Sequence, residues 1–203
     1  DAADGGGGTE GGAAATAVVT APATTPCSPA AADLASITHA ITIKGAQLAW
    51  AILEGHKTIE NRTIRLKPGW YALHVGGGKG TLQLEELSAL QGVPAEDSLT
   101  RSAVVGAIRV SHSLKLEECA GAAWSIGPVC NVVSETVRLS APVAMGGQLG
   151  VWPLGNEALA TVRARLANAD VRANDISHLP GPTAETSKPK GKRKRQVAAA
   201  PPP

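Results

Sequence analysis

The segment KGAQLAWAILEGHKTIENRTIRLKPGWYALHV (44–75) decides the fold, because its hydrophobic period changes along its length. Residues 45–55 carry apolar side chains at helical spacing and end in a glycine, so they predict a helix with a glycine C-cap. Residues 58–65 and 70–75 alternate as strands do, and a proline–glycine turn separates them. The segment therefore predicts a helix followed by two strands.

The sequence on either side of this segment predicts more short strands, with helices between them but no βαβ rhythm. This mixture predicts an α+β fold around a small β-barrel, with the 45–55 helix over one opening. The other predicted elements are strands over 41–44, 102–112, 131–143 and 148–154, a second helix over 81–92 and a closing helix over 156–169.

Composition divides the 203 residues into three parts. Residues 1–35 are mostly Gly, Ala, Thr and Pro, which cannot bury enough apolar surface to offset the entropy of ordering, so they predict a disordered low-complexity segment. Residues 36–170 form the predicted domain with its closing helix. Residues 171–203 are predicted to be a disordered, basic and proline-rich tail.

The tail concentrates positive charge. Six of the 19 basic residues lie in KPKGKRKR (188–195), and the rest of the chain has 13 basic against 17 acidic residues. Such a run predicts a nuclear localisation signal or a nucleic-acid-binding arm; the alternative is a solvated tail with no role. The predicted location is nuclear or cytoplasmic, with nuclear favoured. A nuclear import receptor would contact Lys188, Lys190, Lys192, Arg193, Lys194 and Arg195.

Other classes of function find no support in the sequence. No run of 18 apolar residues is present, so no membrane partner is predicted. The three cysteines are odd in number and lack metal-like spacing, so they predict free thiols rather than a metal site or a disulfide framework. We predict no metal, no cofactor and a monomer.

A local positive cluster is the first sign of a binding site. Residues 44–79 contain six basic residues against Glu54 and Glu60, although the chain without its basic run is acidic overall. An anion would therefore be attracted locally. The six are Lys44, Lys57, Arg62, Arg65, Lys67 and Lys79.

Strand periodicity groups several of these side chains. Glu60 and Arg62 share one face of their strand, and Trp70 and His74 share one face of theirs. If the two strands pair, these groups line one groove beside Lys57. Such a mixture suits a nucleotide, because cations bind phosphate and an indole stacks on a base. The alternative is a Glu60–Arg62 surface ion pair with His74 as a structural histidine.

The tryptophans and one lysine carry separate expectations. Trp50 lies on the polar side of its helix, where it is either covered by another element or a stacking platform. Trp124 and Trp152 lie in apolar stretches and are expected in the core. Lys57 follows the helix at a junction, so it is expected to be exposed.

Three pieces of this sequence resemble the ASCH family of the PUA-like superfamily. They are WAILEGHKTIENR (50–62), GWYALHV (69–75) and RLSAPVAMGGQLGVWPL (138–154), and the first carries the pattern GxKxxExR. The likeness extends from Thr42 to Leu154. The K-x-x-E-N-R wording is most similar to that of eukaryotic ASCH-domain proteins.

The resemblance implies a small PUA-like β-barrel with helices over its openings. It also implies binding of RNA or a modified nucleotide in a cleft beside the motif. Together with the cluster described above, it predicts a ligand-binding set of Trp50, Gly55, Lys57, Glu60, Asn61, Arg62, Trp70, His74 and Lys79.

Two alternatives to a binding module remain open. Some bacterial ASCH proteins remove the acetyl group from acetylcytidine with a Lys, a Thr three residues later and a Glu on a later strand. In this sequence Lys57 matches the Lys, Glu60 replaces the Thr, and Arg109 lies near the position of the Glu. A ribonuclease could instead use Lys57, Glu60 and His74 as acid–base groups, if they converge on one point. The second alternative is a protein-interaction domain whose cleft holds a peptide or nothing.

Overall fold

The computed structural model describes residues 33–78, 85–119 and 121–182. The predictions of disorder for 1–32 and 183–203, the basic run within the latter and the predicted site residue Lys79 lie outside the described residues. Within the described ranges, no helix is long and apolar enough to span a bilayer.

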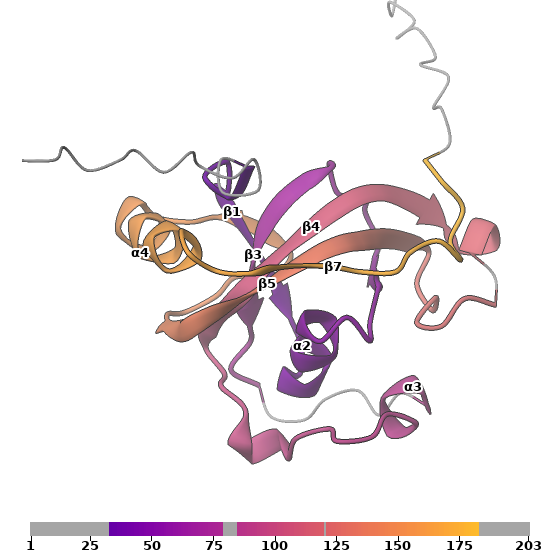
Figure 1. Ribbon diagram of the computed structural model, residues 1–203, viewed down its shortest axis with the longest axis horizontal. Helices are drawn as coiled ribbons and strands as arrows, with labels where there is room; N and C mark the ends of the chain where they lie inside the picture. Colours follow the sequence, from indigo (N-terminus) through magenta and orange to yellow (C-terminus); the bar gives the residue numbers. More distant parts are fainter. Residues whose placement is uncertain (1–32, 79–84, 120, 183–203) are drawn as a thin grey trace, which may run out of the picture.

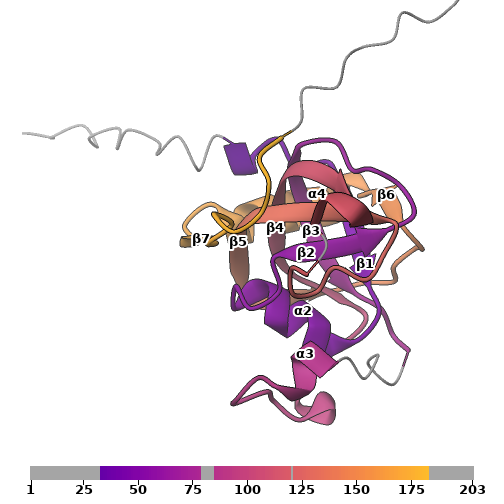
Figure 2. The same ribbon diagram turned by 90° about the vertical axis from the view of Figure 1, so that its right-hand side faces the viewer.

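The described strands form one mixed sheet in the order β2-β5-β4-β3-β1-β6, and β7 pairs with β5. Only β1 and β3 run parallel; every other pair is antiparallel. The sheet curls into a half-barrel, in which the long strands β4 and β5 lie side by side (Figures 1 and 2). The strands are β1 (His39–Ile43), β2 (Ile59–Arg62), β3 (Gly69–Val75), β4 (Ala103–Lys115), β5 (Val129–Ala144), β6 (Val151–Pro153) and β7 (Val171–Ala173).

Two main helices cover the two faces of the sheet (Figure 1). Helix α2 (Ala46–Leu53) packs with inward side chains such as Leu73 and Ile108 in one apolar cluster. Helix α4 (Asn156–Leu166) packs on the other face. The α+β arrangement around a barrel-like sheet is thus confirmed. The shorter helices are α3 (Glu85–Ser88), η1 (Glu96–Ser98) and η2 (Leu116–Cys119).

The end of α2 confirms the predicted glycine stop. Gly55 has a φ of +74°, a left-handed conformation that costs other residues strain, and its N–H bonds Ile52 O at 3.0 Å. The chain then reverses and enters β2.

The strand pairing differs from the one on which the predicted groove depended. Strand β2 pairs with β5 and not with β3, which lies between β1 and β4. Trp70 is also not on a groove wall, because it is buried in a second apolar cluster with Ile37 and residues of α4. Both faces of β3 are therefore core, which alternation alone could not show.

The domain also extends beyond its predicted end at residue 170. Strand β7 adds to the edge of β5, the N–H of Asn174 bonds Ser134 O at 2.8 Å, and Leu179 is buried. At the other end, Leu34 is buried against the second cluster. The predicted second helix is short, because only α3 of its described part is helical.

Candidate functional site

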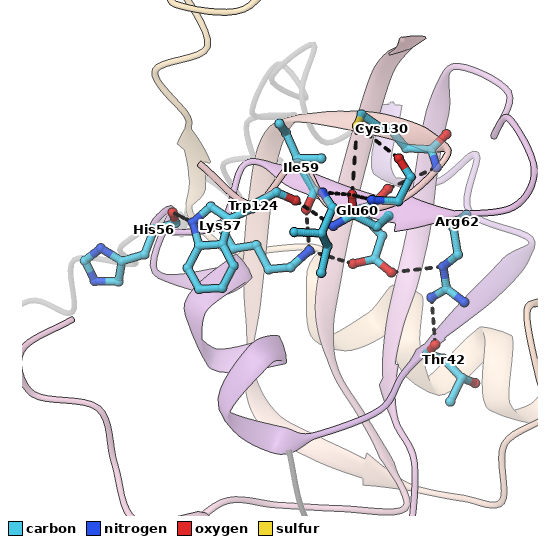
Figure 3. Close-up of polar contacts among 12 residues, drawn as sticks. Thr42, His56, Lys57, Ile59, Glu60, Arg62, Trp124 and Cys130 are labelled. Atoms are coloured by element: carbon cyan, nitrogen blue, oxygen red, sulfur yellow. Dashed lines mark hydrogen bonds and ion pairs between the residues drawn. The ribbon is translucent and has the colours of Figure 1, made fainter. Parts of the chain in front are cut away.

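The motif residues Lys57, Glu60 and Arg62 form a charge network. Lys57 Nζ lies 2.8 Å from Glu60 Oε2, and Arg62 Nε lies 2.9 Å from Glu60 Oε1. Lys57 Nζ also donates to the carbonyl of Ile59. Figure 3 shows the carboxylate between the two cations. One carboxylate therefore holds both positive groups in place.

This network is buried, which corrects two expectations. Lys57 and Glu60 are only 3% and 7% exposed, so Lys57 is not an exposed junction residue and the Glu60–Arg62 pair is not a surface ion pair. The indole of Trp124 covers Lys57, with Nζ 6.0 Å from the ring centroid (Figure 3). A buried charge is tolerated when it is paired and hydrogen-bonded, and Lys57 meets both conditions.

Arg62 links β2, one edge strand of the sheet, to β1, the neighbour of the other edge strand β6. Its Nη2 donates to the carbonyl of Thr42 in β1 at 2.7 Å, which spans the opening between β2 and β1. Its Nε contact with Glu60 is a close charge contact rather than an aligned hydrogen bond. Among the described residues, Nη1 of Arg62 has no partner, so one donor edge of the guanidinium remains available.

Asn61 fixes the loop that covers Lys57. Its Nδ2 donates to Trp124 O at 2.6 Å, and its Oδ1 accepts from the N–H groups of Ile126 and Gly127 at 3.1 and 3.0 Å. A Cβ at Gly127 would lie 2.7 Å from that of Asn61, so the loop packs tightly here. Trp124 itself has a φ of +69°, which is unusual for a bulky residue.

His74 of β3 and Thr42 of β1, which lie opposite each other in the sheet, form a second polar group. Trp152 Nε1 donates to Thr42 Oγ1 at 2.9 Å, and that hydroxyl donates to Gln148 O at 2.6 Å. The His74 ring is 1% exposed, and a Cβ added at Gly147 would overlap it. The main chain at Gly147 therefore rests directly on the imidazole.

The protonation state of His74 follows from its surroundings. Burial lowers the pKa of His74 below its usual 6.5, although the carbonyl of Met145 opposes the shift. The carbonyl lies 3.2 Å from Nε2 and can only accept, so the neutral ring carries its proton on Nε2. Nδ1 lies 3.3 Å from Thr42 Oγ1, whose proton is directed to Gln148 O, so Nδ1 is left as a weakly used acceptor.

Two adjoining cavities follow from this arrangement, and we call them together the groove. The first, of about 440 Å³, is lined by His74 and the glycines of 76–78 and 147; the second, of about 200 Å³, is lined by the motif residues. Both share Thr42, Lys44 and Leu149. The described charged residues that line the groove are Lys44, Lys57, Arg62 and Glu60.

The groove gathers only part of the predicted site. Lys57, Glu60, Asn61, Arg62 and His74 line it, although His74 belongs to one cavity and the Lys57–Glu60 pair to the other. The three proposed acid–base groups therefore do not share one cavity.

Three predicted site residues lie elsewhere. Trp50 is partly exposed against His56, with ring centroids 5.4 Å apart, and it lines a separate cavity of about 160 Å³. Trp70 belongs to the second apolar cluster. Gly55 ends α2 and lies against Asn174. Trp124 and Trp152 are buried, as expected.

Sequence reasoning missed Thr42, Ile126, Gln148 and Leu149 as groove residues and did not single out Lys44 within the basic cluster. Glycines on either side of Gln148 and Leu149 were the available signal, because a glycine-rich stretch before a strand allows close approach of the backbone to a ligand.

Thiol and metal chemistry find little basis at this site. Burial raises the pKa of Cys130 to about 12, so the thiol stays protonated and is a poor nucleophile. Cys119 is also buried and free. The described residues contain no cluster of three or more His, Cys, Asp or Glu side chains that could hold a metal ion.

No protein-family model matches the chain, and no curated protein matches it in sequence. The ASCH resemblance therefore remains a hypothesis carried by its motifs.

Proposed function

We propose that this chain is an RNA- or nucleotide-binding module of the ASCH kind, with a PUA-like barrel and its ligand in the groove. The observation that carries the proposal is the charge of the groove lining: three cations stand against one carboxylate. Because Glu60 is already paired with Lys57 and Arg62, the remaining field is positive. The rest of the chain before the basic run offers no comparable excess.

Two groups are suited to phosphate. Lys44 is exposed, lines both cavities and makes no ion pair among the described residues. Arg62 presents its unpartnered Nη1 in the same groove. Charge-assisted hydrogen bonds from such cations are the usual contacts to a nucleic-acid backbone. The glycines at 76–78 leave the adjacent wall of the larger cavity free of side chains.

The base would meet a neutral polar group. Gln148 offers an amide on the wall of the larger cavity. Such a group reads the edge of an unpaired base through hydrogen bonds. The larger cavity, of about 440 Å³, falls within the size range of small-molecule sites.

The same geometry favours binding over hydrolysis. Lys57 is fixed by Glu60 and Ile59 O beneath Trp124, which leaves it poorly placed to exchange protons with a substrate. His74 lies in the other cavity, so a shared reacting atom would not meet both groups.

Charge reversal at the groove tests the proposal. Lys44→Glu should weaken the binding of a short single-stranded RNA by at least about tenfold at low salt and reduce the slope of log affinity against log salt by about one or more. Lys115→Glu is the matched control, because Lys115 is exposed and lies outside the groove. Fluorescence anisotropy of labelled RNA gives both quantities. Equal affinities for the two variants would contradict the proposal.

The basic run at 188–195 lies outside the described residues. Its roles in nuclear import and in sequence-independent RNA affinity stay predictions, and its contribution is the same in both variants above.

A further inference from the structure

Two exposed aliphatic side chains mark the rim of the groove. Four large hydrophobic side chains are exposed among the described residues, and two of these, Ile126 and Leu149, line the same cavity, at 53% and 82% exposure. A single exposed leucine needs no explanation, but two at the rim of one polar cavity indicate a contact surface.

Leu149 is held out by its neighbours. The hydroxyl of Thr42 donates to Gln148 O at 2.6 Å, and the N–H of Thr42 bonds Gly150 O at 3.2 Å. Both residues flanking Leu149 are therefore bonded to one residue of β1. Gly150 has a φ of +76°, which turns the chain immediately after the leucine.

Ile126 is held in a parallel way on the β2 side. Asn61 donates to the carbonyl of Trp124, which precedes Ile126 in the loop. It also accepts hydrogen bonds from the N–H of Ile126 and from the N–H of Gly127. The exposure of Ile126 is thus built into a fixed loop. Preorganised contact groups lose less entropy on binding than mobile ones.

Ile126 and Leu149 line one cavity from two sides of the sheet, because Asn61 of β2 holds the loop of Ile126 and Thr42 of β1 holds the turn of Leu149. Asn61 and Arg62 belong to β2, Thr42 belongs to β1, and all three line the cavity with Ile126 and Leu149. A ligand between the two aliphatic side chains would therefore have Lys44 and Nη1 of Arg62 beside it. That combination suits a ligand with an apolar ring joined to a negative charge, as in a nucleotide.

We propose that Ile126 and Leu149 form an apolar clamp that holds the two faces of one unstacked base of single-stranded RNA. This proposal rests on the proposed function and specifies its ligand. A base within a duplex is stacked on both faces and cannot enter, so the clamp selects single strands. An apolar side chain of a protein would fill the clamp but would leave the two cations without a counter-charge, so charge complementarity favours the nucleotide.

The test uses a short single-stranded RNA with one 2-aminopurine, whose fluorescence rises when its neighbours no longer stack on it. Addition of the full chain should raise this fluorescence. Ile126→Ala and Leu149→Ala should each lower the affinity about fivefold to tenfold and reduce the fluorescence rise, because each removes apolar contact with the base. Ile64→Ala is the control, because Ile64 is similarly exposed but does not line the groove.

The outcomes separate the clamp from the proposed function. If Lys44→Glu weakens binding but both clamp variants behave like Ile64→Ala, the clamp is wrong and the groove still binds RNA. Equal affinity for duplex and single strands would also overturn the clamp. If Lys44→Glu behaves like Lys115→Glu, the proposed function fails, and the clamp fails with it.

Discussion

The floor and the rim of the groove are built from different kinds of residue. The floor consists of Lys57, Glu60 and Arg62, which are paired with one another and mostly withdrawn from water. The rim consists of Lys44, Ile126 and Leu149, which are exposed. The motif residues therefore contribute mainly to the construction of the site, while the groups placed to meet a ligand, apart from Nη1 of Arg62, lie outside the motif.

Substitutions in the floor and substitutions in the rim should therefore have different effects. A floor substitution leaves a buried charge without its partner, so it should lower the free energy of unfolding. A rim substitution removes a group that touches mainly solvent, so it should change binding and leave stability nearly unchanged.

The largest effect is expected for Glu60→Gln, which leaves Lys57 and Arg62 without their shared carboxylate. The free energy of unfolding should fall by about 3 kcal/mol, because removal of one partner strands a buried charge. Glu54→Gln is the matched control: Glu54 pairs with Arg138 and Arg172 at a more exposed position, and its loss should cost less than about 1 kcal/mol. Urea denaturation measures both. Similar losses for the two variants would remove the distinction between floor and surface.

A smaller effect is expected where the backbone lies on His74. The added methyl group of Gly147→Ala would overlap the imidazole, and a ring that is 1% exposed has little room to move, so we expect a loss of about 1–3 kcal/mol. Gly146→Ala is the control, since nothing lies within 4 Å of its added Cβ. Thermal unfolding would distinguish them. A Gly147→Ala variant as stable as Gly146→Ala would mean that the loop at 147 does not rest on His74.

The sequence was informative about local structure. The spacing of apolar residues located α2 and most of the strands, and Gly55 ends the helix with the predicted left-handed turn. The contact between Glu60 and Arg62 follows from their spacing of two on one strand.

The walls of the groove could not be read in the same way, because they depend on contacts between distant residues. Thr42 bonds Gln148 and Gly150, and Asn61 bonds Trp124 and Gly127, across 60 or more positions of sequence. Periodicity gives the face of a strand but not its neighbour, so it left open whether β2 pairs with β3, and β2 in fact pairs with β5. The same limit explains why Trp70 was assigned to the groove although it is buried in the second apolar cluster.

The smallest effect on stability is expected from the protonation of His74. Its pKa is lower in the folded chain than the ordinary value of 6.5, so the unfolded chain binds more protons when the pH falls below that value. The free energy of unfolding should therefore decrease as the pH drops below about 6.5, and this part of the decrease should be missing in His74→Gln. Urea denaturation between pH 5 and pH 8 measures it, with His178→Gln as the exposed control. A pH dependence unchanged in His74→Gln would show that another group is responsible.

The most direct test of the division between floor and rim is to locate the bound RNA. Single-stranded RNA carrying 4-thiouridine, photocrosslinked to the full chain, should yield crosslinked peptides that contain Lys44, Ile126 or Leu149, because these exposed residues border the proposed ligand. Crosslinks found only outside the groove, whether in the basic run at 188–195 or elsewhere on the sheet, would contradict the account.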